Sequence, residues 1–218
     1  MKKIVLLFAI ASMVCISSFA QDEKYTMAIQ SKLAAIDTSR KTEDLVALSA
    51  AFERIAEAEK TKWLPYYYAA LAQVNAAYFT GTGSIKAEKT DPMADKADAL
   101  LGKADALSPN NSEIYIVKKM IATLRMMADP QNRYMQYGPI AEEALQTAMK
   151  LNPENPRVYL LQGQDKFYTP EQFGGSKAEA VKLFQVAQKK YEAFKPATSI
   201  DPVWGRPAVA YFLAEASK

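Results

Sequence analysis

Residues 97–109, ADALLGKADALSP, contain the pattern that decides the fold. A small residue is followed by a large one four positions later, a second small one after seven and a proline after twelve, and residues 141–153, AEEALQTAMKLNP, repeat this spacing without change. The first three residues lie on one face of a helix, where small side chains let a neighbouring helix approach. The proline ends the helix. Residues 180–187 give the first three positions again, with Phe184 as the large residue. A unit that returns in this way indicates stacked helical hairpins rather than one closed core.

Helical spacing fills most of the rest of the chain, and an alternating strand pattern is almost absent. The sequence therefore predicts an all-α protein. We expect four antiparallel pairs followed by a helix that covers the last apolar face. Pro92 and Pro156 are assigned to first helical positions, and Ser176 to a helix cap. The nine expected helices are 24–37, 42–60, 62–80, 92–107, 112–128, 134–151, 155–168, 176–194 and 203–216.

These second-helix patterns resemble the tetratricopeptide repeat (TPR) family, in which two antiparallel helices form each repeat. Tyr159 and Gly163 match the first-helix pattern of an aromatic and then a small residue, and LSPNN (107–111) and LNPEN (151–155) resemble the inter-repeat turn. The resemblance covers roughly residues 60–195. It implies a right-handed α-solenoid of about four pairs plus a C-terminal capping helix, and it says little about function. The pattern departs at Lys119, where a small residue is expected. It also departs in the first pair, and two interpretations of that pair stay open: a degenerate cap or a true repeat.

The first twenty residues have the features of a secretory signal peptide. Lys2 and Lys3 precede a short apolar run, and Ser18-Phe19-Ala20 supplies small residues at the cleavage positions. We therefore expect residues 1–20 to be removed and residues 21–218 to form a single domain in the periplasm or outside the cell. The apolar run is too short to favour a retained membrane span. Val14 stands before Cys15 where a lipoprotein signal has a small residue, so a lipoprotein is disfavoured.

Composition excludes several kinds of site. Removal of Lys2 and Lys3 lowers the count of Lys and Arg from 27 to 25, against 24 Asp and Glu, so the mature chain is nearly neutral. Binding to nucleic acid through a broad basic surface is therefore not expected. The chain has no histidine, and its one cysteine lies in the signal peptide. Histidine-dependent triads and sites with thiolate or histidine metal ligands are excluded. We expect no enzyme activity, no cofactor and no metal.

The spacing between equivalent helix positions exceeds the TPR period of about 34 residues. The excess falls in three connections within pairs: Gly81–Asp91, Asp129–Arg133 and Thr169–Gly175. Such loops emerge on one edge of a solenoid, so we expect them to be neighbours and to form an interaction surface. Residues of this edge suited to contact are Arg133, Tyr134, Met135, Tyr137, Tyr168 and Phe173. If these aromatics instead cover helix ends, the alternative surface is the groove lined by the first helices, with Arg157 and Gln164 as polar candidates.

Two classes of function stay open. The first is a non-enzymatic scaffold that binds another protein or peptide of the cell envelope. The second is a small-ligand-binding accessory component of a periplasmic uptake system. The Phe173-Gly174-Gly175 loop resembles the repeat component of such systems over a short stretch. An enclosed cavity would favour the second class, and an open groove the first. The sequence leaves the partner and the oligomeric state undetermined.

Overall fold

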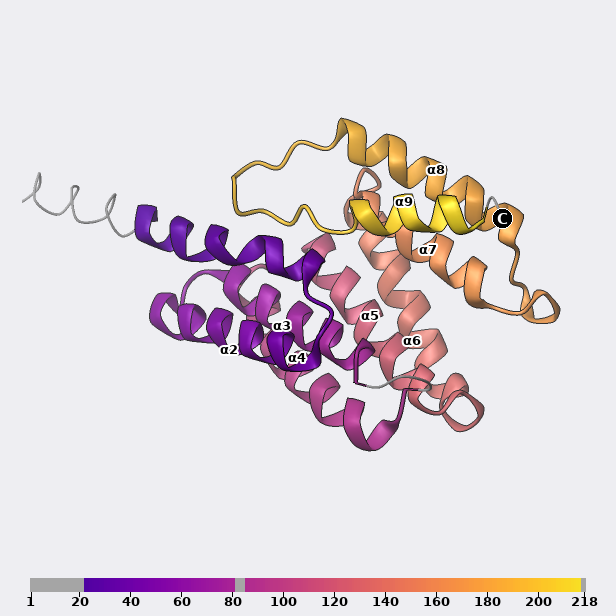
Figure 1. Cartoon of the computed structure of the whole chain (residues 1–218), viewed down its shortest axis with the longest axis horizontal. Helices are drawn as coiled ribbons and strands as arrows, with labels where there is room; N and C mark the ends of the chain where they lie inside the picture. Colours follow the sequence, from indigo (N-terminus) through magenta and orange to yellow (C-terminus); the bar gives the residue numbers. More distant parts are fainter. Residues whose placement is uncertain (1–21, 81–84, 217–218) are drawn as a thin grey trace, which may run out of the picture.

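The computed structural model describes residues 22–80 and 85–216, and these ranges are helical, with no strand among them (Figure 1). The expected all-α class is confirmed. Consecutive helices pack against one another along the chain, and the largest interfaces are α5–α6, α2–α3, α3–α4 and α7–α8. The elements are a helix over 22–38, α2 (Thr42–Glu59), α3 (Trp63–Tyr78), α4 (Ala87–Leu107), α5 (Ser112–Ala128), α6 (Pro130–Leu151), α7 (Pro156–Tyr168), the 3₁₀ turn η1 (Glu171–Phe173), α8 (Lys177–Ala193) and α9 (Arg206–Glu215).

The small residues of the repeated pattern lie at buried helix crossings, as expected. Ala104 and Ala148 are fully buried, and Gly163 is buried as well. A Cβ atom on Gly163 would lie 2.5 Å from Cε1 of Phe184. No side chain fits in that space without moving the ring, so glycine at this position is what allows α7 to approach α8 so closely.

Replacing Ala148 with leucine is expected to lower the free energy of unfolding by roughly 1–3 kcal/mol, because the added atoms overpack a closed crossing. The Ala148 carbonyl also accepts a hydrogen bond of 2.9 Å from the Ser112 hydroxyl, which ties α6 to α5 there. Chemical denaturation of the two proteins measures the loss. Ala99→Leu, on the exposed side of α4, is the matched control and should change stability little. Equal stability of Ala148→Leu and wild type would contradict the register.

Two of the helix starts that differ from the prediction involve an Asp-Pro pair. The helix α6 begins at Pro130, because Asp129 caps it by accepting a hydrogen bond from the Asn132 amide (3.4 Å) and proline suits the first helical position. Only Asp129 separates α5 from α6, so the expected loop Asp129–Arg133 is wrong. Conversely, α4 begins at Ala87 and contains Pro92 in its interior. The expected helix start at Pro92 is wrong as well.

The last helix begins at Arg206 rather than near Val203. Gly205 precedes it with φ of 101°, a left-handed conformation that favours glycine. Residues 194–205 form a non-helical segment between α8 and α9, which we call the strap. In Figure 1 the strap extends away from α8 and returns past the helix 22–38. The α9 residues Val209 and Phe212 are buried, and α9 packs on α8 as expected of a terminal covering helix.

Within the described ranges, no helix combines the length and the apolar character needed to cross a bilayer. The predicted signal peptide and cleavage site lie outside the residues that the structure describes, as do residues 81–84 of the expected Gly81–Asp91 loop between α3 and α4. Residues 87–91 of that expected loop are the first residues of α4, so the loop is shorter than predicted.

Candidate ligand-binding groove

A groove of about 420 Å³ lies between α4 and α6, with α5 as its floor. Both α4 and α6 pack on α5, which leaves one stripe of α5 accessible between them. The α5 residues 115, 118, 122 and 125 and the α6 residues 137, 140, 144 and 147 follow the same helical spacing and face this space. The lining residues are Asp98, Tyr115, Lys118, Ile121, Ala122, Arg125, Tyr137, Ile140, Glu143, Ala144 and Thr147.

The groove combines an aromatic and aliphatic surface with two cations. Lys118 lies over the Tyr115 ring, with Nζ 4.4 Å from the ring centre, and its ammonium donates to Asp105 of α4 at 2.7 Å. Arg125 donates from Nη1 to Asp95 at 2.8 Å and from Nη2 to Asp98 at 2.6 Å. Both cations thus lie along the α4 side, while Tyr137 and Ile140 supply apolar surface from α6.

Arg125 keeps its charge in this setting. Partial burial acts to lower the pKa of its guanidinium, but the hydrogen bonds to Asp98 and Asp95 outweigh burial, and the net shift is upward. The lining also contains Asp98 and Glu143, so its charges balance. Its flat apolar walls suit a largely apolar ligand, whose acidic groups would have to compete with these carboxylates for Lys118 or Arg125. Among the described residues, no cluster of three or more acidic, histidine or cysteine side chains is placed to hold a metal ion.

The residues expected to form a contact edge do not all meet. Tyr137 lines the groove, whereas Arg133 reaches Asp91 of α4 through both Nη atoms, at 2.7 and 2.8 Å. Tyr134 is 60% exposed and its ring lies beside Gly138. Phe173, on η1, is 73% exposed. The loop that was expected to present Arg133 and the neighbouring tyrosines is part of α6, so these side chains project from a helix instead.

At Arg157 the alternative surface along the first helices is covered by the strap. Arg157 is fully buried, and its guanidinium donates to the Pro202 carbonyl of the strap and, at 3.0 Å, to Glu113. Arg157 therefore does not form part of an accessible groove, which corrects the expectation for this residue. Gln164, farther along α7, is half-buried.

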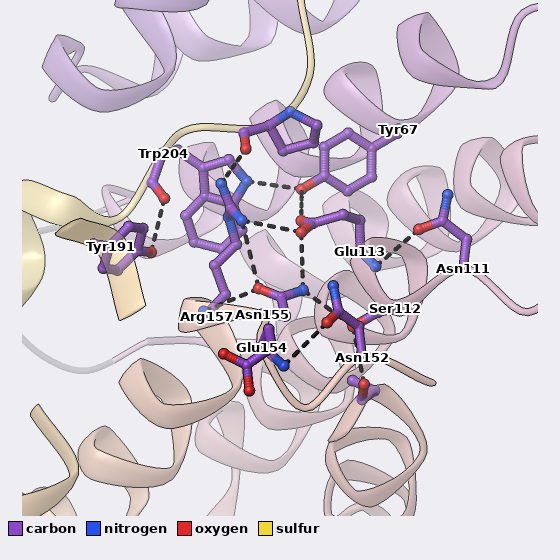
Figure 2. A network of polar contacts seen from close by, with 12 residues as sticks. Tyr67, Asn111, Ser112, Glu113, Asn152, Glu154, Asn155, Arg157, Tyr191 and Trp204 are labelled. Carbon is purple, nitrogen blue, oxygen red and sulfur yellow. Dashed lines mark hydrogen bonds and ion pairs between the residues drawn. The ribbon is translucent and has the colours of Figure 1, made fainter. Parts of the chain in front are cut away.

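Figure 2 shows the buried network that holds the strap. The Glu113 carboxylate accepts hydrogen bonds from Arg157, from the Asn155 amide at 2.8 Å and from the Tyr67 hydroxyl at 3.1 Å. The Tyr67 oxygen in turn accepts from the Trp204 indole at 2.7 Å. One side chain each from α3, α5 and α7 therefore meets the strap at a single point.

The electrostatics of this network follow from burial. Burial raises the pKa of Glu113, while the Arg157 charge and the hydrogen bonds from Tyr67 and Asn155 act to lower it, and the net shift is upward. The Arg157 guanidinium also lies 5.1 Å from the Trp204 ring centre. Its Nε is buried without a hydrogen-bond partner. We interpret the role of this network as structural, since it holds the strap against α3, α5 and α7.

Sequence reasoning missed Lys118 and Arg125. Their signal was present, because Tyr115, Lys118, Ala122 and Arg125 repeat at helical spacing on a first helix. That stripe lies on α5, which carries none of the small-large-small patterns that set the register. Whether it is solvated or lines a groove depends on how far α4 and α6 stand apart, and the sequence does not state that separation.

The chain is similar to a protein of known structure. No protein-family model matches the chain and no curated protein matches it, so the TPR resemblance rests on the residue pattern alone. Among solved structures, the chain is similar to the HusA haemophore from Porphyromonas gingivalis, with a TM-score of 0.77 and 32% sequence identity. The similarity covers 88% of this chain and 92% of that one. At this identity and coverage, the chain belongs to the same family as the HusA haemophore.

Proposed function

We propose that this protein binds haem in the groove between α4, α5 and α6 and acts as a small-ligand carrier or uptake accessory, without enzyme activity. The observation that carries the proposal is the groove itself, in which aromatic and aliphatic side chains adjoin Lys118 and Arg125. Haem is a flat, largely apolar ring with two carboxylates at one edge. The HusA protein, to which this chain is related, is described as a haemophore, and this supports haem as the cargo.

The side chains of the groove fit this cargo chemically. Tyr115 and Tyr137 offer flat surfaces for a ring, and Lys118 and Arg125 offer charges for carboxylates. The chain has no histidine. Tyrosine oxygen is an established ligand of haem iron, so Tyr115 and Tyr137 also provide the atom type that an iron centre accepts.

The groove is open rather than enclosed, which alone would favour the scaffold class, but two other observations support the carrier function better. The strap already covers the first-helix face at Arg157, and the similarity to HusA, a protein described as a haemophore, extends over most of the chain.

We also infer that the helix pairs form a TPR-like right-handed solenoid and that the protein is exported after loss of residues 1–20. The burial of Ala104, Ala148 and Gly163 supports the first inference. The charged and apolar N-terminal sequence supports the second.

A titration with haemin, followed by its Soret absorbance, tests the proposal. Wild type should bind, and the double variant Tyr137→Ala, Ile140→Ala should bind at least about tenfold more weakly, a loss of about 1.4 kcal/mol. The reason is the loss of apolar contact on the α6 wall. The matched control is Tyr211→Ala, Val203→Ala, which truncates similar exposed side chains outside the groove and should bind as wild type does.

Two outcomes would contradict the proposal in different ways. If wild type does not bind haemin, haem is not the cargo. If wild type binds and the groove variant binds equally well, the cargo is right and the α4–α5–α6 groove is the wrong site.

A further inference from the structure

Arg125 differs from the other cations beside the groove because it binds two carboxylates, one of which lines the groove. Its two Nη atoms bind two different carboxylates, Asp95 and Asp98. The Arg125 side chain is only 15% exposed, whereas Asp98 is 53% and Asp95 is 70% exposed. Of the two acids, Asp98 lines the groove and Asp95 does not. The Nη2 atom of Arg125 is therefore paired with an exposed acid, Asp98, that lines the groove.

The neighbouring cations lack this arrangement. Arg133 binds one carboxylate, Asp91, with both Nη atoms, which is a closed two-bond pair outside the groove lining. Lys118 lines the groove, but its partner Asp105 does not. Among the described cations beside the groove, only Arg125 lines the groove together with its exposed acid partner.

We propose that Arg125 is the residue that receives a ligand carboxylate, and that Asp98 is a built-in competitor that the ligand displaces. The inference rests on the proposed function and adds a specificity rule, namely that the site selects ligands bearing a free carboxylate. A guanidinium forms strong charge-assisted hydrogen bonds with carboxylates, and its exposed pair with Asp98 at Nη2 is weak. An incoming carboxylate can therefore replace Asp98 while Asp95 still holds Arg125 in place.

Two probes and two substitutions test this rule. Haemin carries free carboxylates, and haemin dimethyl ester presents the same ring without them. Asp98→Asn keeps the size of the side chain and removes its charge, so haemin should bind about threefold to fivefold more tightly while the affinity for the ester stays the same. Arg125→Gln should weaken haemin binding and leave ester binding unchanged, so the preference of wild type for haemin should disappear.

Glu53→Gln is the matched control, because it makes the same change in net charge and also removes a partner of an α4 cation, Lys96, outside the groove. It should leave both affinities unchanged. Equal tightening of haemin and ester by Asp98→Asn would overturn the competitor role, and so would an unchanged haemin affinity. Arg125→Gln with an intact preference for haemin would overturn the receiving role. If wild type binds neither probe, the haem proposal itself fails, and this result is distinct from the other three.

Discussion

Arg157→Met is expected to lower the free energy of unfolding by about 3–5 kcal/mol at pH 8, because it leaves the Glu113 carboxylate buried without its counter-charge. Arg157 is fully buried, and it also donates to the strap carbonyl of Pro202. Chemical denaturation measures the loss. Arg54→Met, at an exposed position of α2, makes the same chemical change and should have little effect.

The stability lost in Arg157→Met should depend on pH, because Glu113 is titratable. Burial already raises the pKa of Glu113 above its ordinary value of 4.5, and removal of Arg157 takes away the largest influence that lowers it. In the variant the folded state therefore holds a proton that the unfolded state has released, so stability falls as pH rises above 4.5. The deficit relative to wild type should be smaller at pH 5 than at pH 8.

Adding Glu113→Gln to Arg157→Met should restore part of the lost stability at pH 8, since no buried charge then remains. A deficit that is equal at pH 5 and pH 8 would show that Arg157 acts through packing alone. Failure of Glu113→Gln to restore stability would lead to the same conclusion.

Phe184→Ala is expected to cost about 3–5 kcal/mol, the range for removing a fully buried phenylalanine. The Phe184 ring stacks on Phe212 of α9, with ring centres 4.9 Å apart and planes at 10°, and it fills the space opposite Gly163 of α7. Its loss leaves a cavity where α7, α8 and α9 meet. Phe173→Ala is the matched control, because that ring is 73% exposed, and it should change stability by about 0.5 kcal/mol or less.

The same cavity gives a second test. Gly163→Ala in wild type places a methyl group 2.5 Å from the Phe184 ring and should destabilise the protein by about 1–3 kcal/mol. In the Phe184→Ala background the space is open, so Gly163→Ala should then cost nothing or recover some stability. Additive effects of the two substitutions would contradict the contact.

Local patterns in the sequence were enough to predict the helices and their register. Proline, small-residue spacing and charge act over one or two turns, so the burial of Ala104, Ala148 and Gly163 followed from the sequence alone. The two Asp-Pro pairs show the limit of such reasoning. The same dipeptide lies inside α4 at Pro92 and begins α6 at Pro130, because the residues before it continue the helix in one case and end a helix in the other.

The candidate site depended on distances that no local pattern encodes. Tyr137 was assigned to a contact surface, and it does line the groove, but Lys118 and Arg125 were not assigned to any site. Arg157 was assigned to a groove, and the structure buries it instead. The partner that covers Arg157 is the strap, whose Pro202 lies 45 residues farther along the chain, and nothing around Arg157 in the sequence signals that contact.

The strap also changes the order in which the protein can fold. It joins residues far apart in the chain: the hydrogen bonds of Tyr68 with Ile200, Tyr67 with Trp204 and Asp37 with Gly205 span 132, 137 and 168 residues. In an open repeat array each unit contacts only its neighbours, so the ends can unfold separately. Here the N-terminal helices obtain some of their buried partners from the last part of the chain. Closing such long loops slows folding, and it makes the final state wait for the end of synthesis. A chain that is still emerging therefore lacks its native closure until residues 200–205 are available.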